Sequence, residues 1–237
     1  PSFPSGLSEI ANRYDTILCD VWGVIHNGRA AFDEAGQALC NFRKAGGHVI
    51  LITNAPVPNT QVLRYFEPLG VPAEAFDDCV SSGDATREEL ARRENEAIWR
   101  LGADEGWEHD RFLYEGLDLD FVPPDKAELL LCIGLRDRVG GQLYWCAGAL
   151  AAIYEDLGGK VIYPGKPHDA IYRLARSRVE TLGGNIDPKR MLAIGDSPAT
   201  DMRGARLQGI DGLYVGTGLQ EHGSDFQAEI KTLLNTY

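Results

Sequence analysis

Three aspartates of this 237-residue sequence stand where an apolar segment gives way to polar residues. Asp20 ends the run Ile17–Cys19, Asp196 follows the apolar segment 191–194, and Asp201 comes five residues later. Carboxylates gathered at one place repel each other unless a cation lies among them, and oxygen ligands are those that Mg²⁺ prefers. We therefore expect these aspartates to bind Mg²⁺.

A hydroxyl and an ammonium group accompany the carboxylates. Thr53 ends the second apolar segment, 48–53, and Lys166 stands between Gly165 and Pro167, just after a third. A cation, an ammonium group and a hydroxyl donor together suit a phosphate group, whose oxygens Mg²⁺ readily accepts as ligands.

Short apolar segments alternate with segments of helical periodicity. Strands are expected at residues 14–20, 48–53, 79–80, 128–133, 161–163, 191–194 and 213–215. Helices are expected at residues 32–45, 60–69, 84–94, 147–157, 169–182, 201–208 and 226–235, with short β-prone pieces near 98–99, 112–113 and 119–122. This alternation predicts an α/β fold with a doubly wound, Rossmann-like parallel sheet and helices on both faces. In such a sheet the chemistry gathers beyond the carboxyl ends of the strands.

The middle of the chain is less regular than its flanks. We expect a core domain made of residues 1–81 and 164–237, with an α/β cap domain of residues 82–163 inserted into it.

Composition excludes several classes of partner. The net charge of −12 and the absence of a basic cluster argue against binding to nucleic acid or to an anionic membrane. No apolar run is long enough for a membrane span and no signal-peptide pattern is present. The five scattered cysteines form no metal or disulfide pattern. A cytoplasmic protein acting on a small phosphorylated metabolite is expected, and a homo-oligomer is compatible with the sequence.

Four motifs in order resemble those of the haloacid dehalogenase superfamily. Asp20-Val21-Trp22-Gly23-Val24 is similar to its first motif, D-x-D-G-V, and Thr53-Asn54 to its second. Lys166 in Gly-Lys-Pro-His resembles the third, and Gly195-Asp196 through Asp201 the fourth. A cap between the second and third motifs is typical of class IIA, which includes phosphatases of sugars and nucleotides. Class IIA caps generally have a helix and a strand where this sequence passes from Asp137 to Gly140. Either the cap is shortened here or residues are missing from the sequence.

The resemblance implies roles for the reacting groups. Asp20 would attack phosphorus and form an aspartyl-phosphate. Thr53 would donate to the phosphoryl oxygens, and Lys166 would neutralise charge. Mg²⁺ would be held by Asp20, Asp196 and the backbone carbonyl of Trp22.

Further positions are implied around these groups. Asp201 would orient Lys166 or support the metal. The N–H groups of Trp22, Gly23 and Asn54 would bind the phosphoryl oxygens. Gly83, where class IIA chains enter the cap, would be a hinge or substrate-binding residue.

Trp22 departs from the family pattern. Phosphatases of the superfamily normally carry a second aspartate here, which protonates the leaving group and activates water, and indole can do neither. General acid–base help contributes about 10²–10⁴ in rate. Three outcomes follow: an enzyme limited to good leaving groups, an enzyme with a substitute base, or a catalytically impaired relative that binds a phosphorylated ligand. Dehalogenase chemistry, which needs no second aspartate but also no metal site, is a further alternative.

Each residue also has a simpler interpretation. Asp20, Asp196 and Asp201 could be turn or cap residues, and Lys166 a solvated lysine. His26 could replace the missing acid–base group, although a polar residue in a mobile loop is the simpler interpretation.

Overall fold

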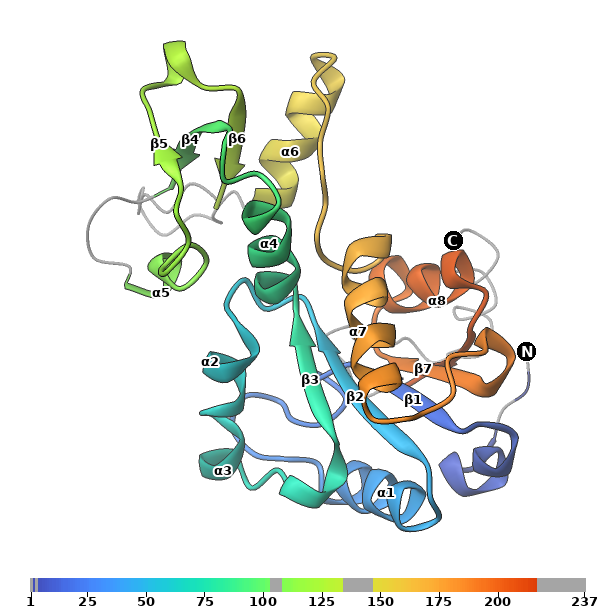
Figure 1. Ribbon diagram of the computed structural model, residues 1–237. Helices are drawn as coiled ribbons and strands as arrows, with labels where there is room; N and C mark the ends of the chain where they lie inside the picture. Colours follow the sequence, from blue (N-terminus) through green and yellow to red (C-terminus); the bar gives the residue numbers. More distant parts are fainter. Residues whose placement is uncertain (1, 3, 103–107, 134–146, 217–237) are drawn as a thin grey trace.

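The larger of two sheets has five parallel strands in the order β3-β2-β1-β7-β8. The computed structural model describes residue 2 and residues 4–102, 108–133 and 147–216 (Figure 1). The strands are β1 (Thr16–Cys19), β2 (His48–Thr53), β3 (Asp78–Ser81), β7 (Met191–Gly195) and β8 (Asp211–Tyr214). The chain adds strands on one side of β1 and later on the other. The strand order therefore reverses between β1 and β7, which is where open α/β sheets bind ligands.

Helices cover both faces of this sheet, because successive side chains of each buried strand point to opposite faces. Ile17 and Cys19 pack into one apolar cluster and Leu18 into the other. The first cluster contains residues of α1 (Asp33–Lys44), α2 (Asn59–Leu63) and α3 (Phe66–Leu69). The second contains residues of α4 (Ser82–Ala91), α7 (Asp169–Thr181) and α8 (Arg203–Gln208). The predicted doubly wound α/β fold is confirmed.

A smaller, three-stranded parallel sheet lies in the middle of the chain. Its order is β5-β4-β6, formed by β4 (Ala97–Leu101), β5 (Asp120–Phe121) and β6 (Leu129–Cys132). Its own apolar cluster includes Leu90 and Ile98, and the helices α5 (Glu108–Arg111) and α6 (Ala147–Asp156) belong to the same part of the chain. In Figure 1, α4 continues upward from the end of β3 into this region, and the chain returns from α6 to α7.

Two elements expected from the sequence are wrong. Residues 161–163 form no strand, and no strand among the described residues pairs with this returning segment. The β-prone piece at 112–113 is a turn after α5. The helix expected at 60–69 is interrupted between α2 and α3, since the ring of Pro68 clashes with the carbonyl group four residues earlier and its nitrogen cannot donate.

Other differences concern boundaries. Helix α4 begins two residues earlier than expected, because Ser81 caps it and Asp84 completes a capping box. The helix expected at 201–208 is instead a π-helical turn, Pro198–Met202, followed by α8. The helix predicted at 226–235 and the irregularity at 137–140 lie outside the described residues. Among the described residues, no helix combines the length and the apolar character needed to cross a membrane.

Candidate active site

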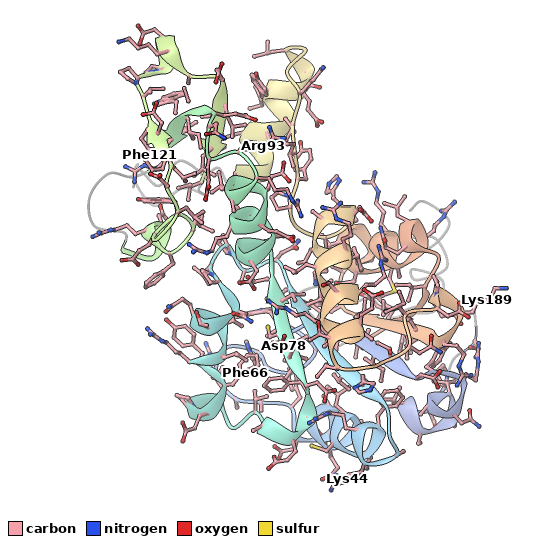
Figure 2. The ribbon with its side chains drawn as sticks, viewed as in Figure 1. Lys44, Phe66, Asp78, Arg93, Phe121 and Lys189 are labelled. Atoms are coloured by element: carbon pink, nitrogen blue, oxygen red, sulfur yellow. The ribbon has the colours of Figure 1, made fainter. Side chains whose placement is uncertain are left out.

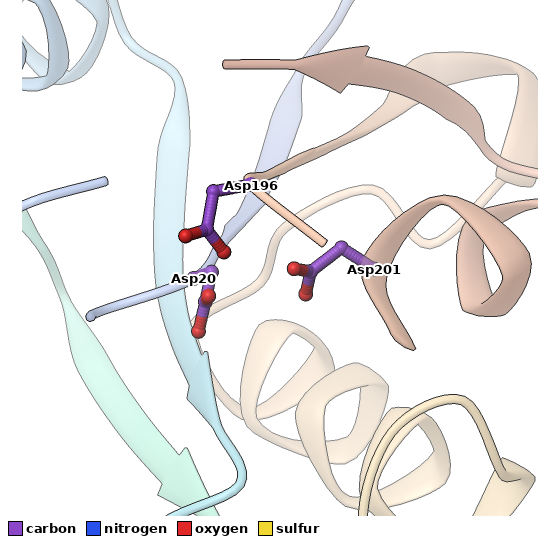
Figure 3. Close-up of side chains that lie close together, drawn as sticks. All are labelled: Asp20, Asp196 and Asp201. Carbon is purple, nitrogen blue, oxygen red and sulfur yellow. The ribbon is translucent and has the colours of Figure 1, made fainter. Parts of the chain in front are cut away.

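The three aspartates predicted to bind metal meet at the carboxyl edge of the larger sheet (Figure 3). Asp20 follows β1 and Asp196 follows β7, and these strands are neighbours in parallel register. The N–H of Asp20 donates to the carbonyl of Ile194 at 2.8 Å, which extends this pairing to the aspartate itself. One carboxylate oxygen from each of Asp20, Asp196 and Asp201 lies within 4.8 Å of the others, and all three residues are buried.

Gly195 is required by the position of Asp201. A Cβ atom at Gly195 would lie 2.2 Å from both Cβ and Cγ of Asp201, far closer than atoms can pack. The carboxylate of Asp201 also accepts a hydrogen bond from the N–H of Ser197 at 3.1 Å. The π-helical turn thus folds Asp201 back onto the end of β7, which brings its carboxylate beside those of the other two aspartates.

Lys166 neutralises part of this acidic cluster. Its Nζ donates to Oδ1 of Asp20 and to Oδ1 of Asp201, each at 2.7 Å, and its side chain is only 3% exposed. Burial alone would lower the pKa of Lys166, but the two carboxylates raise it well above its ordinary value. Burial raises the pKa of Asp20 and of Asp201, and the attraction of Lys166 opposes that rise. One ammonium group therefore serves two buried carboxylates, and negative charge remains for a cation.

The second motif contributes a hydroxyl and an amide. Thr53 is buried at the end of β2, and its Oγ1 accepts a hydrogen bond from the N–H of Ala55 at 3.2 Å. The side chain of Asn54 makes two hydrogen bonds to the backbone of Lys166. Only the backbone N–H of Asn54 was assigned a role from the sequence. No sequence signal reveals this contact, because the two residues are 112 positions apart.

Trp22 belongs to a tightly packed loop beside the site. Trp22 is 45% exposed, and its indole makes an edge contact with the ring of His26, with 5.5 Å between ring centroids. A Cβ at Gly28 would lie 2.3 Å from the indole, so glycine is needed where the loop passes the ring. The Nδ1 of His26 accepts from the N–H of Gly28 at 3.1 Å, and the same ring contacts Phe66.

These contacts correct the interpretation of His26 as a polar residue in a mobile loop. His26 is buried, and burial lowers its pKa. It is a neutral packing residue that holds the loop to the core.

Two glycines with predicted substrate roles already make backbone contacts. The N–H of Gly23 donates to the carbonyl of His26 at 2.9 Å, a bond that a phosphoryl oxygen would have to replace. Gly83 lies in the first turn of α4, where a Cβ would be 2.3 Å from the backbone of Val57, and its N–H donates to Ala55. Close packing is sufficient to require glycine at position 83, and its substrate role stays a prediction.

The residues present fit a magnesium ion. Three carboxylates can offer one oxygen each to a common centre, all ligands are oxygen, and a single ammonium group leaves the cluster net negative. In the described parts of the chain, the group of residues that could hold a metal consists of three aspartates and contains no cysteine or histidine.

Comparison with known proteins identifies the family of the chain. A family model described as "Haloacid dehalogenase-like hydrolase" matches residues 17–110, and a second model of the same kind of hydrolase matches residues 163–233. A crystal structure of a haloacid dehalogenase-like hydrolase from Brucella suis is 37% identical, with 92% of this chain and 90% of that chain covered and a TM-score of 0.79. The chain belongs to the haloacid dehalogenase-like hydrolases, and the class IIA resemblance noted from its motifs is confirmed.

A more distant structure shows the same fold, and a partial sequence match is also found. The magnesium complex of a glycerol phosphate phosphatase from Mycobacterium tuberculosis is 22% identical, with 90% of this chain and 70% of that chain covered and a TM-score of 0.66. A cardiolipin synthase / mitochondrial hydrolase fusion protein of Schizosaccharomyces pombe is 33% identical over 75 residues. That match covers 29% of this chain and 13% of the fusion protein.

Proposed function

We propose that this chain is a Mg²⁺-dependent phosphatase that hydrolyses a small phosphorylated metabolite, a sugar or nucleotide phosphate, through an aspartyl-phosphate on Asp20. The observation that carries this proposal is the contact of Asp20 with Lys166 beside two further buried aspartates. A magnesium complex of a phosphatase with the same fold supports it.

The chemistry assigned to this chain's residues is nucleophilic. A carboxylate oxygen of Asp20 attacks phosphorus while the bond to the leaving oxygen breaks, and water then hydrolyses the acyl phosphate. Lys166 balances the charge of Asp20 and of the phosphoryl oxygens, and the hydroxyl group of Thr53 donates a hydrogen bond to one of those oxygens. Asp201 holds Lys166 in place.

Magnesium would be held by Asp20, Asp196 and the backbone carbonyl of Trp22, with Asp201 close by. When bound, it supplies positive charge that attracts phosphoryl oxygens and offsets the repulsion among the carboxylates.

The absence of an aspartate at position 22 should limit the range of phosphate esters that the protein hydrolyses. Because no carboxyl group stands at this position and His26 is buried and neutral, we infer that the leaving group departs without protonation by either residue. Aryl and acyl phosphates, whose leaving groups are stable as anions, should react faster than alkyl phosphates.

The second unit, residues 82–163, is proposed to act as a cap over the site. It is attached to the core by α4, beyond the carboxyl end of β3, the same end at which Asp20 lies on β1 (Figure 1). Such a position suits exclusion of water and selection of substrate.

A second candidate function is binding without turnover. Trp22 favours it, since the family's acid–base aspartate is absent. In that case the chain would hold a phosphorylated ligand for regulation.

The deciding experiment measures hydrolysis of an aryl phosphate and an acyl phosphate with Mg²⁺ and with EDTA. Asp20→Asn is the inactive control, and the exposed Asp125→Asn is a matched control that should keep full activity. Turnover that requires both Mg²⁺ and Asp20 supports the phosphatase. Absence of Mg²⁺-dependent turnover on both substrates would leave only the binding function.

A further inference from the structure

The oxygen and the nitrogen of the Asn54 side-chain amide both form hydrogen bonds with one residue, Lys166. Its Oδ1 accepts a hydrogen bond from the N–H of Lys166 at 2.7 Å, and its Nδ2 donates to the carbonyl of Lys166 at 3.0 Å. The other end of Lys166 is held by Asp20 and Asp201. Lys166 is therefore fixed at its backbone and at its ammonium group, and a long flexible side chain is kept in one conformation.

The residue before Lys166 shows how close this contact is. A Cβ at Gly165 would lie 2.7 Å from Oδ1 of Asn54 and 3.2 Å from Cβ of Ser82. Gly165 belongs to the segment that returns from the second unit to the core. Asn54 and Ser82 thus pack directly against this returning segment.

Ser82 connects Asn54 to the outgoing segment as well. Ser82 is the first residue of α4. Its hydroxyl group donates a hydrogen bond shared by the carbonyls of Asn54 and Ala55, at 3.0 and 2.9 Å. The next residue, Gly83, donates its N–H to Ala55 at 3.2 Å. Both connections between the core and the second unit therefore meet at Asn54.

We propose that Asn54 is a positioning residue that fixes Lys166 and ties it to the base of α4 through Ser82. A displacement of α4 then changes the position of the ammonium group beside Asp20. In this way the second unit can influence the nucleophile without touching it. The kinetic consequence rests on the proposed phosphatase activity, whereas the placement of Lys166 does not.

Chemical labelling of lysines tests the placement directly. Reductive methylation with formaldehyde and a borohydride, followed by mass spectrometry, compares Lys166 with the exposed Lys44 and Lys189 (Figure 2). In Asn54→Ala, the labelling rate of Lys166 relative to these two should rise about tenfold or more, as expected for the loss of two hydrogen bonds. Asn54→Asp, which keeps the acceptor but not the donor, should give a smaller rise and serves if the alanine variant does not fold.

Two further variants separate positioning from general loosening of the fold. Ser82→Ala should increase the labelling of Lys166 about threefold, because one shared hydrogen bond is lost. Asn59→Ala is the matched control: its Nδ2 donates to the carbonyl of Cys79 at 2.8 Å, away from Lys166, so labelling should not change. Unchanged labelling of Lys166 in both the Asn54 and Ser82 variants would overturn the proposal, as would an equal rise in Asn59→Ala.

A double-mutant cycle on aryl phosphate hydrolysis tests the consequence for catalysis. Asn54→Ala should lower kcat about 10²-fold with little change in KM, because misplacement of a catalytic group has this order of effect. In a Lys166→Ala background the same substitution should cost less than threefold, since it acts through the lysine. Equal losses in both backgrounds contradict the coupling. Failure of the wild-type protein to turn over contradicts the proposed function instead, and the labelling result then decides on Asn54 alone.

Discussion

Replacement of Lys166 by methionine removes one charge from a buried cluster while keeping most of the side-chain volume. The ammonium group is 2.7 Å from each of two carboxylates, and the side chains of Lys166, Asp20 and Asp201 are 3%, 11% and 4% exposed. Removing one partner of a buried ion pair costs about 3–5 kcal/mol, because the remaining charge has lost its compensation. In Lys166→Met, Asp20 and Asp201 both lose the ammonium group that compensates their charge. We therefore expect the free energy of unfolding to fall by about 4–5 kcal/mol at pH 8 without Mg²⁺.

The loss should depend on pH in a defined direction. Burial raises the pKa of Asp20 and of Asp201, and without Lys166 only the backbone N–H groups of Val21 and Ser197 still oppose that rise. A carboxyl group whose pKa is higher in the folded state binds more protons there than in the unfolded state. The free energy of unfolding therefore falls as the pH rises from the unfolded pKa of about 4 through the folded pKa. In the wild-type protein Lys166 stays charged throughout this range, because its own pKa is raised. The difference between variant and wild type should shrink when the pH is lowered from 8 to 5.

Urea unfolding in EDTA at pH 8 and at pH 5, with far-UV circular dichroism, measures both effects. Thermal unfolding should show a decrease in Tm of about 8–20 °C, given about 2–4 °C per kcal/mol for a chain of this size. Lys160→Met is the matched control, since this lysine is exposed, and it should stay within about 0.5 kcal/mol of the wild type. A loss below 1 kcal/mol, or an equal loss at both pH values, would refute the reasoning from buried charge.

Three further outcomes are expected. Gly195→Ala should lower the free energy of unfolding, measured by urea titration, by about 1–3 kcal/mol, because the added Cβ would overlap Asp201. Gly148→Ala is the control: no atom lies within 4 Å of its added Cβ, so the substitution should be neutral or slightly stabilising. Trp22→Asp should raise kcat on alkyl phosphates more than on aryl phosphates, and equal gains would show that protonation of the leaving group is not the deficit. Mg²⁺ at about 100 times its Kd should stabilise the wild type by about 2.7 kcal/mol in thermal unfolding, and Asp196→Asn should lose most of that gain; an unaffected gain would place the ion elsewhere.

Local sequence was sufficient for much of the core. Buried parallel strands are apolar along their whole length, so the runs that became β1, β2 and β7 stand out, together with the polar residues that end them. Composition did not predict the structure of residues 161–163, which are apolar like a strand but pair with no strand in the part of the chain that the structure describes. It also missed Pro68, whose effect on the preceding turn of helix outweighs the apolar periodicity of 60–69.

Some features of the candidate site could likewise be predicted from local sequence, and others could not. The types of its groups were readable from the chain, because Asp20, Thr53, Lys166 and Asp196 follow strands or stand before a helix in a recognisable order. The role of Asn54 was not, since its side chain acts on a residue far along the chain. The loop that holds Trp22 was not readable either, since it depends on how His26 packs against Phe66.

The sequence by itself determined which chemical groups this protein has and that Asp20, Thr53 and Asp196 lie at strand ends, because buried parallel strands are apolar along their length and can be recognised locally. Only the tertiary structure decided their electrostatic state. The pairing of Lys166 with Asp20 joins residues 146 positions apart, and its effect on both depends on their removal from water. Attraction and burial act on these groups in opposite directions, and which of them dominates is set by the packing around the site.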